Sequence, residues 1–361
     1  MKVGMRKLNL AIVGCGWAGE IHATDLLKLQ ERFSMAVCCD PDASRRQAFA
    51  TKYGIERNVG SLEEVLAMAD IDAVAICTPP MLHHAMVLAV LAADKHAICE
   101  KPFVSSIGLV DSIAEAERRS KGRVMPIFQY RYGDGAARVH AVIQSGLAGK
   151  HYVTSVEVAR TRAAEYYSVQ WRGKFASELG GVHVTQAIHI NDMLYWMLGP
   201  VAEVSSFKTT RVNPIEVEDC AVTSMRLQDG SLVSVASTLG SVGQLTRVRM
   251  CFEHVSFERN SDHDKSKPAD APWTVLPRNA EVASLIEAKM AEVPAGHAWF
   301  ARQYELFADA LATGGEFPVT LADARASMEL VTAQYYADES GCAVRLPIGP
   351  DHPRYGGWLP N

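Results

Sequence analysis

A glycine-rich turn near the N-terminus constrains the fold more than any other feature of the sequence. It follows the apolar run Leu8–Val13 directly, and helical spacing of apolar residues begins at Ile21. The turn consists of Gly14, Cys15, Gly16, Trp17, Ala18 and Gly19. Glycines at its first, third and sixth positions permit a tight strand-to-helix turn and a close approach of the backbone to a pyrophosphate. Because the N–H groups at the start of a helix bind phosphate, the turn predicts a dinucleotide site.

The first third of the chain alternates short apolar runs with helical patterns. Further buried strands are expected at Phe33–Cys39, Ala73–Cys77 and His96–Cys99, and helices at Ser44–Tyr53 and Leu82–Ala93. Strands that alternate with helices indicate βαβ units and a parallel sheet with helices on both faces. The sequence therefore predicts an α/β fold with an N-terminal Rossmann domain, a doubly wound parallel sheet, over residues 1–125.

The pattern changes near residue 125, and the remainder predicts an α+β domain over residues 126–361. Runs rich in Val and Thr alternate in hydrophobicity, and Gln228-Asp229-Gly230 joins two of them as a hairpin turn. The sequence thus predicts a large open, mainly antiparallel sheet. Expected strands are Val153–Arg162, Cys220–Leu227, Ser231–Leu239 and Val248–Glu258. Expected helices are Val182–Leu198, 297–313 and 321–340, with a surface loop at Ser261–Pro272 and an irregular tail at Leu346–Asn361.

An acidic residue stands where a ribose-binding carboxylate belongs in this kind of fold. Asp40 ends the second predicted strand, about 20 residues after the last glycine of the turn. A carboxylate there bonds the ribose 2′-hydroxyl and repels a 2′-phosphate, which favours NAD over NADP. Arg45 and Arg46 follow closely and are of the type that would bind such a phosphate, so NADP stays the alternative.

Composition excludes several classes of protein. The formal net charge is −5 and no long Lys/Arg run occurs, which argues against a nucleic-acid partner. The apolar stretches are far shorter than the roughly 18–20 residues that span a bilayer, so no membrane segment is expected. Eight cysteines without a C-x-x-C pair predict buried free thiols in a reducing cytoplasm, with a zinc or redox-active site as the alternative.

Two further motifs close the third and fourth predicted strands, at the sheet edge where such folds bind ligands. They are residues 78–83 (TPPMLH) and 100–102 (EKP). With the glycine turn, the segment from Tyr166 to Gly199 and the pair Gly296-His297, they make the chain resemble the glucose–fructose oxidoreductase/inositol dehydrogenase (Gfo/Idh/MocA) family. Expected cofactor contacts are the glycine turn with Asp40, Arg45, Thr78, Pro79, His83, Glu100 and Lys101.

The resemblance implies an NAD-dependent enzyme that oxidises a secondary hydroxyl of a sugar, sugar acid or cyclitol. It assigns catalysis to Lys101 and to His189: the histidine accepts the hydroxyl proton and the lysine donates a hydrogen bond to the substrate oxygen. An imidazole suits proton transfer at neutral pH. Expected substrate contacts are Lys101, Arg131, Tyr167, Trp171, Arg172, Thr185, Gln186, His189 and His297. Further polar candidates are Arg160, Arg162, Tyr166 and His183.

One position departs from the family pattern. Many members carry an aspartate four residues before the histidine, but here that residue is Thr185; Asp192 stands on the same helix face and is a possible substitute. The variant is compatible with a sugar dehydrogenase and with an NAD-requiring glycosidase or lyase that oxidises its sugar only transiently. A third class, a non-catalytic dinucleotide-sensing protein, is disfavoured by the presence of Lys101 and His189. The resemblance also implies a homodimer or homotetramer assembled through the open sheet.

Overall fold

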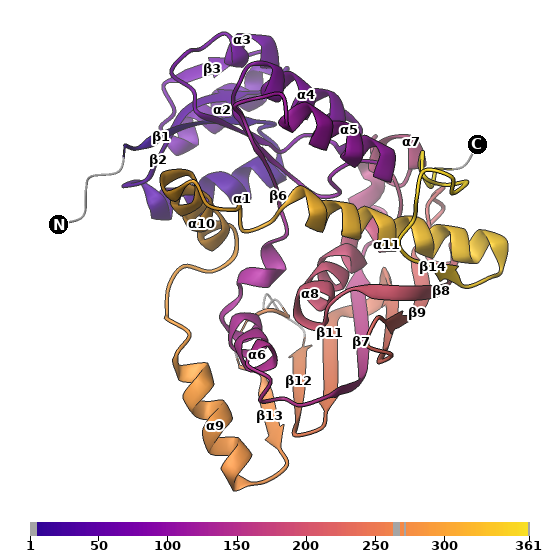
Figure 1. Ribbon diagram of the computed structural model, residues 1–361. Coiled ribbons are helices and arrows are strands. Elements are labelled where there is room, and N and C mark those ends of the chain that lie inside the picture. Colours follow the sequence, from indigo (N-terminus) through magenta and orange to yellow (C-terminus); the bar gives the residue numbers. More distant parts are fainter. Residues whose placement is uncertain (1–5, 263–267, 271, 360–361) are drawn as a thin grey trace. The chain divides into compact units, whose positions relative to one another are not determined.

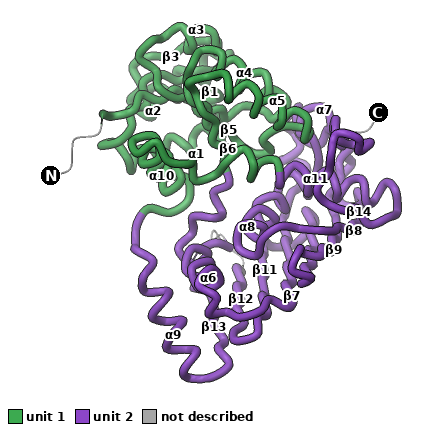
Figure 2. The backbone as a smooth tube through the Cα atoms, viewed as in Figure 1, with its two compact units in different colours: residues 1–127, 297–325 green, residues 128–296, 326–361 purple. Residues whose placement is uncertain are grey.

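The computed structural model of the protein describes residues 6–262, 268–270 and 272–359 (Figure 1). They form two compact units, each built from two separate stretches of chain (Figure 2). The first unit comprises residues 1–127 and 297–325, and the second comprises residues 128–296 and 326–361. Within the described ranges, no helix combines the length and the apolar character needed to cross a bilayer.

The first unit contains a six-stranded sheet in the order β3-β2-β1-β4-β5-β6, and every neighbouring pair is parallel. Its strands are β1 (Leu8–Val13), β2 (Phe33–Cys39), β3 (Arg57–Val59), β4 (Ala73–Ile76), β5 (His96–Cys99) and β6 (Val124–Pro126). Its helices are α1 (Trp17–Leu26), η1 (Leu27–Leu29), α2 (Ala43–Tyr53), α3 (Leu62–Leu66), η2 (Pro80–Leu82), α4 (His83–Ala92), α5 (Ile107–Glu117) and α10 (Trp299–Thr313).

Strands β1 and β4 show why the apolar runs fold this way. All four residues of β4 are buried, as are the last four of β1, because helices cover both faces of a doubly wound sheet. The strand order reverses at β1, between β2 and β4, and this is the switch point at which such sheets bind ligands. The predicted doubly wound parallel sheet is confirmed.

Helix α10 belongs to the first unit, although the sequence analysis placed residues 126–361 in one C-terminal domain. Its Tyr304 is completely buried, with the ring edge-on to Phe33 of β2. Arg32 donates hydrogen bonds to the carbonyl of Glu305 and to Asp309. The two hydrogen bonds of Arg32 join residues 273 and 277 positions apart, which local sequence patterns do not encode.

The second unit contains an eight-stranded sheet in the order β13-β12-β11-β7-β10-β9-β8-β14. Its strands are β7 (His151–Thr161), β8 (Val201–Thr209), β9 (Cys220–Leu227), β10 (Leu232–Thr238), β11 (Gly240–Phe252), β12 (Val255–Asp262), β13 (Thr274–Pro277) and β14 (Val344–Arg345). Its helical segments are η3 (Gln129–Tyr132), α6 (Asp134–Gln144), η4 (Tyr166–Ser168), α7 (Phe175–Glu178), η5 (His183–Ala187), α8 (Ile188–Leu198), α9 (Ala280–Ala291) and residues 326–340 of α11 (Leu321–Ser340). Among the described residues of this sheet, only β7 and β10 pair in parallel, so the predicted mainly antiparallel sheet is confirmed.

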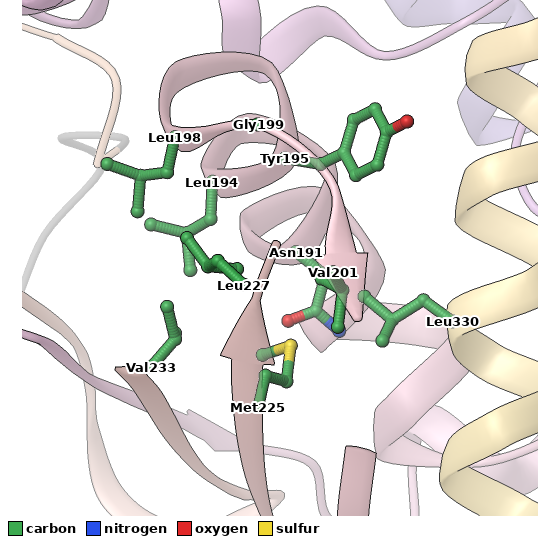
Figure 3. A pocket seen from close by; sticks show the side chains of 10 residues that line it. All are labelled: Asn191, Leu194, Tyr195, Leu198, Gly199, Val201, Met225, Leu227, Val233 and Leu330. Carbon is green, nitrogen blue, oxygen red and sulfur yellow. The ribbon is translucent and has the colours of Figure 1, made fainter. Parts of the chain in front are cut away.

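One face of this sheet packs against α8 and α11. Strands β9 and β10 alternate strictly between buried and exposed side chains. The buried side lies against both helices around a small cavity (Figure 3) that is lined by Asn191 and otherwise mainly by apolar side chains. The cavity holds about 10 Å³, no more than a single water molecule needs. It is therefore a packing gap in the core and not a substrate site.

The predicted strand Val248–Glu258 is wrong in its bounds, because two antiparallel strands occupy this region. Strands β11 and β12 pair with Cys251 opposite Ser256, and the chain reverses through Glu253 and His254. No glycine, proline or asparagine marks this turn, so the sequence pattern reads as continuous. Of the predicted loop Ser261–Pro272, residues 263–267 and 271 lie outside the described residues, and β12 extends to Asp262.

Candidate active site

The glycine turn places two of its glycines against the backbone and leaves the third open. Gly14 has a left-handed φ of +98°, and a Cβ there would lie 2.7 Å from the carbonyl oxygen of Cys77. A Cβ on Gly19 would lie 2.2 Å from the carbonyl oxygen of Gly14. A Cβ on Gly16 would meet no atom within 4 Å, and no side chain caps the start of α1. This start of α1, with Trp17 exposed and Ala18 half-buried beside it, therefore offers backbone N–H groups to a pyrophosphate.

The Asp40 carboxylate ties the end of β2 to this turn. Its Oδ2 accepts the N–H of Cys15 at 3.0 Å, and its Oδ1 accepts the N–H of Asp42 at 3.0 Å. The Arg45 guanidinium lies 3.3 Å from Oδ1, and that of Arg46 donates to the Asp40 carbonyl. A fixed carboxylate beside an open glycine turn fits the adenosine ribose and pyrophosphate of NAD.

The loops that follow β4 and β5 are held together by His83. Its Nε2 lies 3.0 Å from the carbonyl oxygen of Thr78, and its Nδ1 lies 2.9 Å from that of Pro102. The side chain is fully buried, and this burial lowers its pKa. His83 therefore shapes the loop that carries Thr78 and Pro79. Its predicted contact with the cofactor stays a prediction.

Glu100 fixes the backbone beside Lys101. Its Oε1 accepts a hydrogen bond from Nε2 of His22 at 2.9 Å, and its Oε2 accepts the N–H of Lys101 at 2.9 Å. The other ring nitrogen of His22 lies 2.6 Å from the Tyr304 hydroxyl. Burial acts to raise the pKa of Glu100, but the hydrogen bond and charge of His22, with the charge and N–H of Lys101, hold it below the ordinary value. We assign Glu100 to positioning Lys101, whose side chain is half-buried at the sheet edge.

In the second unit, His189 lies in the first turn of α8. The preceding turn, η5, is a π-helix, a rare geometry that is frequent at functional sites. The imidazole stacks on the Tyr130 ring, with centroids 4.7 Å apart and planes 16° from parallel. This contact fixes the orientation of a ring that is only 8% exposed.

Glu218 holds the entry to the π-helical turn. Its carboxylate accepts the N–H groups of Gly181 and His183, at 3.1 and 3.0 Å, and the Tyr335 hydroxyl at 2.7 Å. A Cβ on Gly181 would lie 1.7 Å from the Glu218 carbonyl oxygen, so only glycine fits there. The Thr185 hydroxyl donates to the carbonyl oxygen of Gly181 at 2.8 Å, within the same turn.

Arg131, a predicted substrate contact, instead forms a buried ion pair. Its Nε donates to Oδ2 of Asp192 at 2.8 Å and its Nη2 to Oδ1 at 2.5 Å, and both side chains are almost fully buried. We therefore assign Arg131 to anchoring α8 and not to the substrate. The same pair holds both carboxylate oxygens of Asp192, the predicted substitute for the missing family aspartate.

Of the other predicted substrate contacts, most lie in the second unit and His297 lies in the first. Arg172 pairs with Glu178 at 3.1 Å, and its guanidinium lies 3.9 Å from the ring centroid of Tyr166 and 4.5 Å from that of Trp171. Tyr167 packs against the buried cluster Val182, Ala221 and Leu239, and Gln186 is half-buried on the π-helical turn. His297 lies in the first unit, 3.7 Å from Glu305, and not in the region that the sequence assigned to substrate binding.

Sequence reasoning missed Tyr130, Glu178, Glu218 and His22. None of these four residues belongs to a recognisable motif. The partners of Tyr130, Glu218 and His22 also lie far away in the chain. Tyr130 stands next to Arg131, and that proximity was its only signal.

Both parts of the chain match profiles of known protein families. The family profile described as an oxidoreductase family with an NAD-binding Rossmann fold matches residues 8–128. The profile of the GFO/IDH/MocA C-terminal domain matches residues 136–270, so the two together match well over half of the chain. The chain belongs to the Gfo/Idh/MocA family. As a member of that family, it is an oxidoreductase whose cofactor is NAD.

The curated relatives of this Gfo/Idh/MocA protein are distant. The uncharacterized oxidoreductase YrbE of Bacillus subtilis is 22% identical over 96% of this chain and 98% of its own length. An uncharacterized oxidoreductase of Synechocystis is 25% identical, and the alignment covers 62% of that protein. The myo-inositol 2-dehydrogenase of Thermotoga maritima is 24% identical over 62% of this chain and 66% of its own length.

Solved structures share the whole fold. The WlbA dehydrogenase of Bordetella pertussis, solved with NADH and UDP-GlcNAcA, superposes with a TM-score of 0.83 at 24% identity. The match covers 96% of this chain and 100% of that one. Levoglucosan dehydrogenase, solved with NADH and levoglucosan, gives a TM-score of 0.80 at 19% identity over 95% of this chain and 100% of that one. At these identities the likeness establishes the fold alone.

Proposed function

We propose that this Gfo/Idh/MocA protein oxidises a secondary hydroxyl of a sugar, sugar acid or cyclitol and passes the hydride to NAD. The observation that carries the proposal is the setting of His189, a buried imidazole oriented by Tyr130 directly after a π-helical turn. The names of relatives support the substrate class, since they include a myo-inositol 2-dehydrogenase and the D-apiose dehydrogenase of Rhizobium rhizogenes.

We assign the proton transfer to His189 and the binding of the substrate oxygen to Lys101. The hydroxyl proton passes to the His189 imidazole as the carbon–hydrogen bond breaks, so that a carbonyl forms. The Lys101 ammonium donates a hydrogen bond to the same oxygen and stabilises the negative charge that develops on it. Bound NAD supplies the acceptor for the hydride.

A paired measurement of reduced cofactor and product tests this function. The purified protein is incubated with NAD and a panel of sugars, sugar acids, cyclitols and glycosides, while the absorbance of reduced nicotinamide and the identity of the product are followed together. The proposal expects NADH and an oxidised sugar in equal amounts from at least one substrate. Glycoside cleavage without net NADH would instead identify the redox-assisted glycosidase or lyase, and NAD binding without turnover of the panel would indicate a sensor.

The same proposal includes a homo-oligomer in a reducing compartment. The outer face of the eight-stranded sheet carries exposed apolar side chains, among them Phe207 and Val222, as an interface between copies requires. All eight cysteines lie in the described residues and are free thiols, as expected in the cytoplasm.

A further inference from the structure

Two arginines extend the buried face of β7 toward the residues around His189. Val156 and Val158 point into the core, and the period of two along a strand puts Arg160 on the same side. Arg162 directly follows Thr161, the last residue of β7, and lies two residues after Arg160, so the same alternation places it on that side. Both arginines are half-buried.

Neutral oxygens hold the Arg160 guanidinium. Its Nη1 donates to the carbonyl oxygens of Ala159 at 2.9 Å and Leu245 at 2.7 Å, and its Nη2 donates to Oγ1 of Thr246 at 2.8 Å. These bonds fix the direction of the group without neutralising its charge.

The Arg162 side chain also meets neutral groups, the Thr161 carbonyl and the Tyr166 hydroxyl. Its Nη1 donates to the carbonyl oxygen of Thr161 at 2.8 Å, whereas its buried Nε meets no acceptor among the described residues. Within the part of the chain that the structure describes, neither Arg160 nor Arg162 pairs with a carboxylate. A half-buried cation with an unused donor favours an anionic partner, because an unmade bond at a buried charged group is costly.

Two tyrosines connect these arginines to the candidate active site. Tyr130 stacks on His189, and its hydroxyl meets the Arg160 guanidinium: burial raises the pKa of Tyr130, and the charge and hydrogen bond of Arg160 oppose that rise. The Arg162 guanidinium lies 5.0 Å from the ring centroid of Tyr166, which also faces Arg172 at 3.9 Å. Arg160 thus lies on a residue that stacks on the proposed base, and Arg162 lies on a tyrosine that it shares with Arg172, a predicted substrate contact.

Three acidic groups, Glu178, Asp219 and Asp270, act on the tyrosines beside Arg160 and Arg162. Glu178 is already paired with Arg172. The charge of Asp270 reaches Tyr130 and raises the pKa of that residue, in opposition to Arg160. The charge of Asp219 acts on Tyr167, as that of Arg162 does, and its carboxylate accepts the backbone N–H groups of Arg211, Val212 and Asn213. Among the described residues, none of these three carboxylates hydrogen-bonds to Arg160 or Arg162.

We propose that Arg160 and Arg162 bind an anionic group of the substrate, a carboxylate or a phosphate, so that the substrate is an acidic or phosphorylated sugar. The inference rests on the proposed function and narrows its substrate class. A planar guanidinium matches either anion with two parallel hydrogen bonds, and the fixed Arg160 together with the open donor of Arg162 supplies such a site.

The test compares matched sugars that differ only in charge. Calorimetric titrations with saturating NADH use D-glucose, D-glucuronate and D-glucose 6-phosphate, and the corresponding galactose and mannose compounds. We expect a uronate or a sugar phosphate to bind at least about 10-fold more tightly than its neutral partner, the range of one charge-assisted bond. The preferred member distinguishes a carboxylate from a phosphate. Equal affinity within every set, or no binding of any member, overturns the proposal.

Variants localise the effect. Arg162→Gln should weaken binding of the preferred anion by about 10- to 100-fold and change the affinity for NADH and the neutral sugar by less than about 2-fold. Arg278→Gln, which removes an exposed charge elsewhere in the second unit, should leave every affinity unchanged. An Arg162→Gln protein that keeps wild-type affinity for the anion contradicts the assignment. If the protein forms NADH from neutral sugars as readily as from the anionic ones, only this inference is refuted. If anionic sugars bind through Arg162 but no sugar of the panel is oxidised, only the proposed function is refuted.

Discussion

At the edge of the six-stranded sheet, some residues already hydrogen-bond within the protein, and others are exposed. The polar atoms of His83 and Glu100 hold the backbone of the loops that follow β4 and β5. Gly16 and Trp17 face open space. We therefore expect His83 and Glu100 to shape the backbone that meets the cofactor, and Asp40 and the exposed backbone of the turn to make the contact.

Cofactor choice depends on Asp40. We expect the protein to bind NAD more tightly than NADP, because a carboxylate at this position repels a 2′-phosphate. Asp40→Asn should weaken NAD binding by about 10-fold or more and narrow the difference between the cofactors, since one charge-assisted bond is lost. Asp42→Asn, at the N-cap of α2, is the matched control and should change neither constant. Dissociation constants that favour NADP would contradict this prediction and would indicate that Arg45 and Arg46 bind the 2′-phosphate.

Glu100 should make stability depend on acid pH. Its pKa lies below the ordinary 4.5, so folding favours the ionised form: the contribution is present above the unfolded pKa and is lost as pH falls through the folded value. Glu100→Gln should lower the free energy of unfolding at pH 7 by about 1.5–3 kcal/mol, and the difference from wild type should shrink below about pH 4. Urea unfolding of both proteins across pH measures it, with the exposed Glu56→Gln as control. A difference that is constant with pH would rule out the ionised pair.

Among the elements, the π-helical turn before α8 depends on one side chain. Glu218→Ala leaves the buried N–H groups of Gly181 and His183 and the Tyr335 hydroxyl without their acceptor. Each loss costs about 1–3 kcal/mol, so we expect one of the largest destabilisations of any single substitution in this unit. Thermal unfolding measures the loss, and Glu218→Gln, which keeps one acceptor oxygen, should recover part of it. If both variants unfold at the wild-type temperature, the carboxylate does not hold the turn.

The elements that sequence patterns predicted are those whose ends carry a local signal. Cys220–Leu227 and the helix 321–340 appear with the predicted bounds. A hairpin turn ends the strand, and Thr320 and the left-handed Gly341 bound the helix. Helices α5, α6 and α9 were not predicted, although Ser106 and Asn279 cap the first and last of them. Helix α10 was predicted, but its membership of the first unit was not.

The candidate site divides in the same way. The positions of the glycine turn and Asp40 could be predicted from the sequence, because a doubly wound fold brings neighbouring strand ends to one edge of the sheet. The ion pair between Arg131 and Asp192 joins residues 61 positions apart. The stacking of Tyr130 on His189 is equally remote in sequence. Only tertiary structure shows that Arg131 pairs with a residue of α8 and that Tyr130 stacks on His189, the proposed base.

At the scale of the whole molecule, the outer face of the eight-stranded sheet combines a row of small side chains with exposed ion pairs such as Arg247–Glu157 and Arg226–Glu203. Ser205, Ser224, Ser234 and Ser155 lie opposite one another on four adjacent strands and are all exposed. Beside them Phe207 pairs with Val222. Small and apolar side chains in register suit the approach of a second sheet.

Light scattering of the purified protein tests this interface. We expect a mass of two or four times the 39.4 kDa chain for wild type. Ser224→Arg and Phe207→Glu should shift the mass to that of the monomer, because each buries a charge against the partner copy. Leu285→Glu, at an exposed apolar position on α9, should leave the mass unchanged. A stable wild-type monomer at micromolar concentration would contradict the interface.

The central claim is that this chain removes a hydride and a proton from a sugar hydroxyl, with His189 as the base. Its most direct test is the pH dependence of NADH formation by wild type and His189→Ala, on a substrate found in the panel. We predict that wild-type turnover rises with pH as the imidazole loses its proton, and that the variant is slower by about 10²–10⁴ and lacks this rise. The NAD affinity of the two proteins should agree, because the glycine turn and Asp40 are unchanged. A variant that keeps near wild-type turnover with the same pH profile would contradict the account.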